Sequence, residues 1–154
     1  MAGLSHKDDY LETPDCLINN IEYETGLKFN FDLCGSIQNA KTPAFFSEQD
    51  NYLERELNKK MVAFCNPPRS KNGLFVNKVF DDWQKYNINI VMLLCWNDLG
   101  NKYGDKIFKK ILQRKIKAVN LGKIKFCKDK QLTPFVSRLT YFYAWFKKDP
   151  YGRN

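Results

Sequence analysis

The chain has 154 residues, enough for one domain that buries about two-thirds of the surface of its unfolded form. Its formal net charge is +8, from 25 Lys and Arg against 17 Asp and Glu. No stretch approaches the roughly 20 apolar residues of a membrane-spanning helix, and the polar first nine residues lack the apolar core of a signal peptide. We therefore expect a single cytoplasmic domain over residues 1–154, not secreted, with an ordered core over about residues 10–148.

The five cysteines are spread along the chain, with no CxxC pair, and His6 is the sole histidine. A zinc site is not predicted, because four closely placed thiolate and imidazole ligands are missing. Most of these cysteines fall in apolar, strand-like stretches, where a buried reduced thiol is the usual state.

The first third of the chain predicts a helix followed by a strand. Thr13 is a good N-cap and Pro14 is favourable at the first helical position, with Gly26 as the stop signal. Apolar and polar residues then alternate over residues 27–33, which is typical of a strand, up to a turn at 34–36. Helix, strand and turn in this order, with an acid near the end of the strand, are typical of the start of a nucleotide-binding α/β unit.

The middle of the chain continues this pattern. Residues 39–47 predict a loop around a short strand, and residues 50–59 either a helix or an ordered loop. A strand over 61–65, a helix over 72–86 and an apolar strand over 87–95 follow. Helices alternating with strands predict an α/β domain with a mostly parallel sheet.

The last third predicts a basic helix over 102–114, strands over 115–119 and 123–127, and a final strand over 135–146. Two strands with no helix between them predict a C-terminal antiparallel hairpin at the edge of the sheet.

The positive charge is concentrated in one part of the chain. Eleven Lys and Arg lie between Lys102 and Lys130, against Asp105 and Asp129. Such a local excess, interleaved with aromatic residues, favours a nucleic-acid partner, the alternative being a solvated lysine-rich face.

Asn66 stands at the end of the 61–65 strand and is followed by two prolines. Pro67 and Pro68 have a fixed φ and no backbone N–H, so they end the strand in a rigid, extended form. The carboxyl edge of an open α/β sheet is where ligands bind, and an amide there suits recognition of an exocyclic amine. The simpler alternative is a strand-ending turn.

The order of these landmarks resembles the phage-type DNA N-6-adenine methyltransferase family. The resemblance rests on Asn66-Pro67-Pro68, on the turn after Asp32, and on segments 10–14, 39–41, 92–94 and 122–126. Phe46 and Asp50 fall where that family has an aromatic segment and an acid. The resemblance covers most of the chain and implies a Rossmann-like, S-adenosylmethionine-dependent methyltransferase fold.

The resemblance also implies a reaction: methyl transfer from S-adenosylmethionine to the N6 amine of adenine in DNA, in the host cytoplasm if the protein is viral. The side-chain carbonyl of Asn66 and the backbone carbonyl of Pro67 would accept hydrogen bonds from the amine. Pro68 and Arg69 would complete the catalytic segment. The adenine would have to leave the DNA helix to reach this site.

The remaining site residues follow from the same resemblance. Asp32, Cys34 and Gly35 would lie by the methionine part of the cofactor, Phe46 on its adenine, and Asp50 at its amine. Thr13 and Pro14 would contribute backbone contacts near its carboxylate. Phosphate contacts would come from basic side chains: Arg69, Lys71, Lys102, Lys106, Lys109, Lys110 and Arg114.

Three departures leave alternatives open. Arg69 stands where the family has an aromatic residue, so it could stack on the target base, reach a DNA phosphate, or mark a lost activity. Gly35 is the single glycine of the first turn, and Leu33 replaces a proline. The alternatives to DNA methylation are a non-catalytic nucleic-acid-binding relative and a methyltransferase that acts on RNA adenine or protein glutamine.

Overall fold

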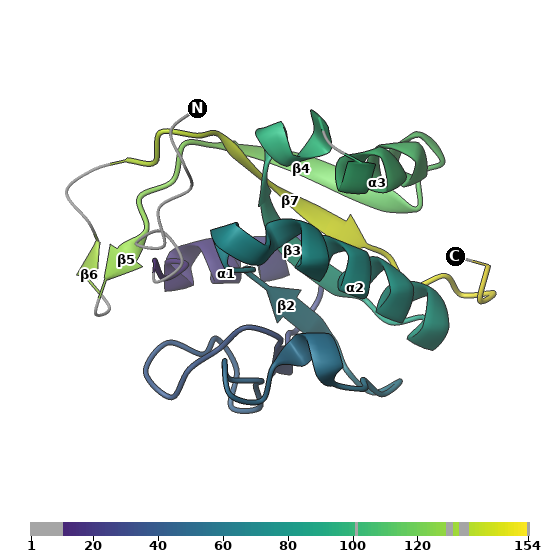
Figure 1. Cartoon of the computed structure of the whole chain (residues 1–154), viewed down its shortest axis with the longest axis horizontal. Helices are drawn as coiled ribbons and strands as arrows, with labels where there is room; N and C mark the ends of the chain where they lie inside the picture. Colours follow the sequence, from purple (N-terminus) through teal and green to yellow (C-terminus); the bar gives the residue numbers. More distant parts are fainter. Residues whose placement is uncertain (1–10, 101, 129–130, 133–135, 154) are drawn as a thin grey trace.

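The computed structural model describes residues 11–153 except 101, 129–130 and 133–135. A five-stranded sheet with the order β1-β2-β3-β7-β4 forms the centre of the domain (Figure 1). Strands β1, β2 and β3 are parallel, and β7 is antiparallel to both β3 and β4, so that four of the five strands run in one direction. The bounds are β1 Phe31–Asp32, β2 Ala63–Cys65, β3 Ile90–Cys95, β4 Ile116–Gly122 and β7 Tyr141–Phe146.

Three α-helices and a small hairpin complete the described part of the chain. Strands β5 (Cys127–Lys128) and β6 (Gln131–Leu132) pair with each other and stand apart from the main sheet. Short 3-10 helices cover Tyr52–Glu54, Arg69–Lys71 and Trp96–Gly100. The α-helices are α1 Asp15–Thr25, α2 Asn72–Tyr86 and α3 Lys102–Leu112.

The sheet has a hydrophobic core on each face. On one face, α2 and α3 pack on alternate side chains of the strands, among them Ile90, Met92 and Leu94. On the other face, α1 packs on the intervening side chains, among them Val91 and Leu93. Because both faces are covered, β3 is buried along its whole length, as its continuous apolar run predicted. No helix in the described ranges combines the length and the apolar character needed to cross a membrane.

The structure confirms the α/β alternation and the helix over 72–86, but it corrects the first strand and the end of the chain. The strand predicted over 27–33 joins the sheet only at β1. Phe29 and Leu33 do not share a face of the sheet, because Phe29 packs in the hydrophobic core beneath α1 and Leu33 in the core beneath α2. The strands predicted over 115–119 and 123–127 do not pair with each other. Strand β4 instead continues to Gly122 through an irregularity after Asn120, and its antiparallel partner at the sheet edge is β7.

The loop between β1 and β2 is attached to α2 by a buried hydrogen bond. The hydroxyl of Tyr52, which is 1% exposed, donates to the Asp82 carboxylate at 2.6 Å. Burial and the neighbouring carboxylate raise the pKa of Tyr52, so the hydroxyl remains a donor at neutral pH. Lys78 pairs with the same carboxylate at 2.9 Å.

Substituting Tyr52→Phe should lower the free energy of unfolding by about 1.5–3 kcal/mol, because the buried carboxylate loses a charge-assisted hydrogen bond. Chemical denaturation measures the change. Tyr86→Phe is the matched control, since its hydroxyl bonds to the exposed carboxylate of Glu56, and it should leave stability unchanged. Equal losses in the two variants would contradict this account.

Candidate active site

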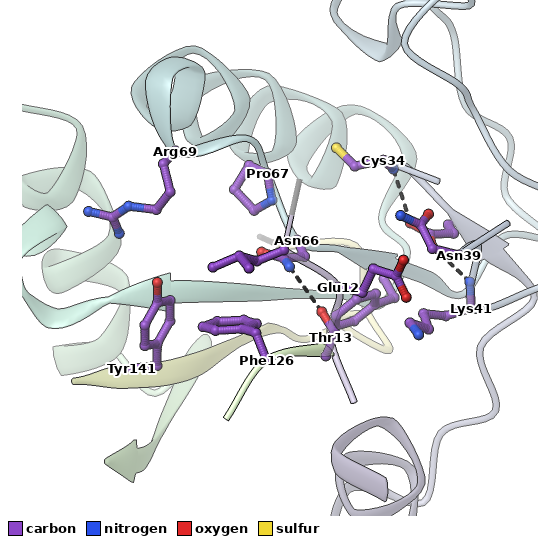
Figure 2. A pocket seen from close by; sticks show the side chains of 13 residues that line it. Glu12, Thr13, Cys34, Asn39, Lys41, Asn66, Pro67, Arg69, Phe126 and Tyr141 are labelled. Carbon is purple, nitrogen blue, oxygen red and sulfur yellow. Dashed lines mark hydrogen bonds between the residues drawn. The ribbon is translucent and has the colours of Figure 1, made fainter. Parts of the chain in front are cut away.

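A pocket opens at the carboxyl ends of β1 and β2, where an α/β sheet places its ligands (Figure 2). Its enclosed volume is about 70 Å³, and the rest of the pocket is open to solvent. It gathers residues from the first, middle and last parts of the chain: Leu11, Glu12, Thr13, Asp32, Cys34, Asn39, Lys41, Phe64, Asn66, Pro67, Arg69, Phe126 and Tyr141.

Asn66 lies in the middle of this pocket (Figure 2). Its side-chain N–H donates to the hydroxyl of Thr13 at 2.9 Å, across 53 positions of sequence. Thr13 is 3% exposed, so it is a fixed partner. The helix predicted to begin with a Thr13 cap has Pro14 at its N-cap position instead, with no side-chain cap. The hydroxyl of Thr13 therefore fixes the side-chain amide of Asn66 by accepting a hydrogen bond from the amide nitrogen.

Asp32 shapes the loop that forms one wall of the pocket. Its carboxylate is 3% exposed and accepts the backbone N–H of Cys34 at 3.0 Å and of Lys41 at 2.9 Å. Burial raises the pKa of Asp32, and the two backbone hydrogen bonds oppose that rise. A Cβ on Gly35 would lie 2.9 Å from the Cβ atoms of Ala40 and Phe45, so glycine permits this close approach.

The Cys34 thiol, which lines the pocket, is not a nucleophile at neutral pH. The Sγ atoms of Cys34 and Cys65 lie 3.6 Å apart. Burial and the neighbouring thiol raise the pKa of Cys34 well above its usual value, so it stays protonated. Both cysteines are free, as the sequence predicted.

Arg69 is held at one end of the pocket. Its guanidinium is 13% exposed, lies 3.7 Å from the Asp98 carboxylate, and donates to the thiol of Cys95. Asp98 also accepts the backbone N–H of Cys95 at 3.1 Å and the side-chain amide of Asn72. The charge of Arg69 is therefore balanced within the protein, which disfavours the alternative that it reaches a DNA phosphate.

The pocket has a polar end and an aromatic end, on opposite sides of Asn66 (Figure 2). At the polar end, Lys41 is only 11% exposed and pairs with Asp15 at 2.9 Å, and Glu12 lies nearby. At the aromatic end, the rings of Phe126 and Tyr141 meet edge to face at 5.1 Å.

Sequence reasoning missed seven pocket residues as site residues: Leu11, Glu12, Asn39, Lys41, Phe64, Phe126 and Tyr141. All of them except Phe64 and Tyr141 lie in segments that the family resemblance had picked out, which was the available signal. No sequence signal pointed to Tyr141, because its place in the pocket depends on the pairing of β7 with β3, in which Tyr141 lies opposite Cys95.

Several predicted cofactor residues lie outside the pocket lining. The ring of Phe46 stacks on Tyr52 with centroids 6.1 Å apart and meets Phe31 edge to face at 4.7 Å. Asp50 accepts hydrogen bonds from the backbone and hydroxyl of Ser47. The residues predicted for the site but absent from the lining are Pro14, Gly35, Phe46, Asp50 and Pro68.

The structure spreads the predicted phosphate-binding residues over the length of α3. Lys71 precedes α2 and Lys102 begins α3, both near the carboxyl end of β3. Lys110 lies over the ring of Trp83, and Arg114 lies two residues before the start of β4. Ile116, the first residue of β4, and Ile90, the first residue of β3, both pair with Phe146. Arg114 therefore lies near the amino ends of these strands, whereas the pocket lies at the carboxyl ends.

Metal ligation has no candidate in the described ranges, where no three His, Cys, Asp or Glu side chains are placed to hold an ion.

Comparison with known proteins identifies the family. The profile of DNA N-6-adenine-methyltransferase (Dam) matches residues 3–135. The chain belongs to this family. It is similar to the DNA N-6-adenine-methyltransferase of Escherichia phage T1, with 33% identity over 86 residues, which make up 56% of this chain and 35% of that relative. The matched region thus spans about a third of the phage T1 protein.

The Arg69 cluster leads to a stability prediction. Substituting Asp98→Ala leaves a largely buried guanidinium without its carboxylate and should lower the free energy of unfolding by about 2 kcal/mol. Asp105→Ala is the control, because it removes the same charge from an exposed ion pair. Lys109 is 69% exposed and Asp105 is 60% exposed, so the free energy of unfolding should change little. Chemical denaturation compares the two variants, and an Asp98→Ala variant as stable as the control would refute the role given to Asp98.

Proposed function

We propose that this protein transfers a methyl group from S-adenosylmethionine to the N6 amine of adenine in DNA, on a Rossmann-like methyltransferase fold. The observation that carries the proposal is the place of Asn66, between a polar and an aromatic compartment, with its amide nitrogen engaged by Thr13. The name of the phage T1 relative and the family membership support the same reaction. An enzyme acting on phage DNA would work in the host cytoplasm.

The polar compartment fits the amino-acid part of the cofactor. Lys41 pairs with Asp15, whose side chain is 85% exposed and so screened by water, and its ammonium group adds a positive charge for a carboxylate. Glu12 adds a negative charge for an ammonium group. The Asp32 carboxylate keeps the connecting loop in shape through the backbone of Cys34 and Lys41. When bound, S-adenosylmethionine supplies an electrophilic methyl group on its sulfonium sulfur.

The aromatic compartment fits the target base. Phe126 and Tyr141 offer ring surfaces for an adenine that has left the DNA stack, and Pro67 adds an apolar contact. In this proposal the two rings take over the stacking role of the aromatic residue that Arg69 replaces, which favours an active enzyme over a lost activity. Arg69 closes that end of the pocket while Asp98 and Cys95 hold it.

Asn66 performs the recognition step between the two compartments. With its nitrogen bonded to Thr13, its carbonyl oxygen is available to accept an N–H of the adenine amine. The Pro67 carbonyl is the second acceptor. Two acceptors orient the lone pair of the amine, so the contribution is positioning and electrostatic, with no covalent intermediate on the protein.

Incubation with methyl-labelled S-adenosylmethionine and adenine-containing DNA should place the label in N6-methyladenine. Asn66→Ala should lower kcat roughly 100-fold or more, because an acceptor at the reacting nitrogen is lost, while calorimetry shows the cofactor affinity unchanged. No label in double- or single-stranded DNA would refute the proposal. Label in RNA or protein instead would assign the alternative substrates.

Thr13 should act as a positioning residue for Asn66. Thr13→Val keeps the side-chain shape without the hydroxyl and should lower kcat about tenfold, equivalent to a lost hydrogen bond of about 1.4 kcal/mol, with KM for S-adenosylmethionine unchanged. Thr13→Ser keeps the hydroxyl and should retain activity. The role is refuted if the Ser variant loses as much activity as the Val variant.

A further inference from the structure

The segment that follows β4 has two sides. Ile124, Phe126 and Cys127 are buried, and Phe126 lines the pocket. The backbone of Cys127 exchanges hydrogen bonds of 2.9 and 2.8 Å with Glu12, which also lines the pocket. The intervening side chains are exposed, and all three are lysines: Lys123, Lys125 and Lys128.

Arg138 adds a fourth charge to this strip. The backbone N–H of Ser137 donates to the Ile124 carbonyl at 2.8 Å, and the Ser137 hydroxyl accepts the N–H of Ile124 at 2.9 Å. These two bonds place the exposed Arg138 beside the 123–128 segment. We call Lys123, Lys125, Lys128 and Arg138 the basic rim. In the sequence, residues 123–138 contain five Lys and Arg against one acid.

The basic rim differs from α3 in how its charges are used. Within the described ranges, no carboxylate or hydrogen-bond acceptor engages the four rim side chains. On α3, Lys106 donates to Asn77 at 2.9 Å and Lys109 pairs with Asp105 at 2.9 Å. Lys110 lies over the ring of Trp83, 5.9 Å from its centroid. The four rim charges are thus available to an external anion, whereas Lys106, Lys109 and Lys110 of α3 are engaged within the protein.

The basic rim also lies beside the pocket, whereas α3 leads away from it. Strand β4 runs in the same direction as β3, so the segment after Gly122 reaches the edge of the sheet where β1 and β2 open onto the pocket. Hairpin β5–β6 and helix α3 lie on opposite sides of the molecule (Figure 1). A phosphate chain on the rim would pass next to the aromatic end that Phe126 forms.

We propose that the basic rim, and not the exposed face of α3, binds the DNA backbone and presents the adenine to the pocket. The proposal rests on the proposed function, because it takes DNA as the polyanion. Free, exposed ammonium and guanidinium groups release counterions when they meet phosphates, which makes the affinity depend on salt. The rim stands at the mouth of the aromatic compartment, so phosphate contacts there position a base that has left the stack.

The test compares two double charge reversals in the full chain. Lys125→Glu with Lys128→Glu alters the basic rim, and Lys106→Glu with Lys109→Glu alters α3 by the same charge. Fluorescence anisotropy with a labelled duplex DNA at several KCl concentrations gives the affinity and its salt slope. The rim variant should bind at least about tenfold more weakly, and its slope should fall by about two. The α3 variant should bind like wild type.

Equal binding by the rim variant and wild type, or a larger loss in the α3 variant, overturns the proposal. Stronger binding of wild type to duplex RNA than to DNA also overturns it. A second rim variant, Lys125→Gln with Lys128→Gln, removes the two charges without reversing them and should weaken binding to a smaller degree. Thermal unfolding is measured for every variant to show that it is folded. Because the assay needs no methyl transfer, rim-dependent DNA binding by a protein that methylates nothing would leave this inference standing and refute the proposed function alone.

Discussion

The hydrogen bond between Asn66 and Thr13 joins the two halves of the site. Asn66 reaches its place because two prolines end β2, and Thr13 because α1 begins two residues later with Pro14 as its cap. Neither feature by itself orients an amide. Together they fix a flat side chain at the edge of the sheet, with a polar compartment on one side and an aromatic compartment on the other. The proposed chemistry depends on that orientation, since an amine is recognised by acceptors and not by donors.

Arg69 illustrates how a departure from a family pattern acquires a physical meaning. At the sequence level, it admits stacking, phosphate binding or lost activity. In the structure its charge is matched by Asp98, and its guanidinium also donates to Cys95. Burial raises the pKa of Cys95, while hydrogen bonds from Tyr141 and Arg69 act against that rise. One thiol thus accepts from both Arg69 and Tyr141, and couples the arginine to the aromatic end of the pocket.

The distribution of positive charge follows the same logic. The net charge of +8 is a property of the sequence, and most of the excess lies in one stretch. Within that stretch, the side chains of α3 are engaged with Asn77, with Asp105 and with aromatic rings. The extended segment after β4 leaves its lysines exposed beside the pocket. Folding therefore divides one basic stretch into a structural part and a part available to a polyanion.

The sequence by itself determined the elements that depend on local chemistry. The helix over 72–86 follows from apolar spacing, the burial of β3 from its apolar run, and the place of Asn66 from Pro67 and Pro68. Gly26 ends α1 with a φ of 71°, as its freedom to adopt left-handed backbone predicted. Each of these features depends on residues that are close to one another in the sequence.

Only the tertiary structure decided what depends on register and on distant partners. Thr13 predicts a helix cap locally, but its hydroxyl bonds to an amide 53 residues away. Tyr141 enters the pocket because β7 is inserted between β3 and β4, a pairing that no local pattern fixes. The strands predicted over 115–119 and 123–127 failed as a pair for the same reason, since β4 pairs with the distant strand β7 from Ile116 to Gly122. Local propensity selects the elements, and the pairing of distant backbone and the burial of both sheet faces select their partners.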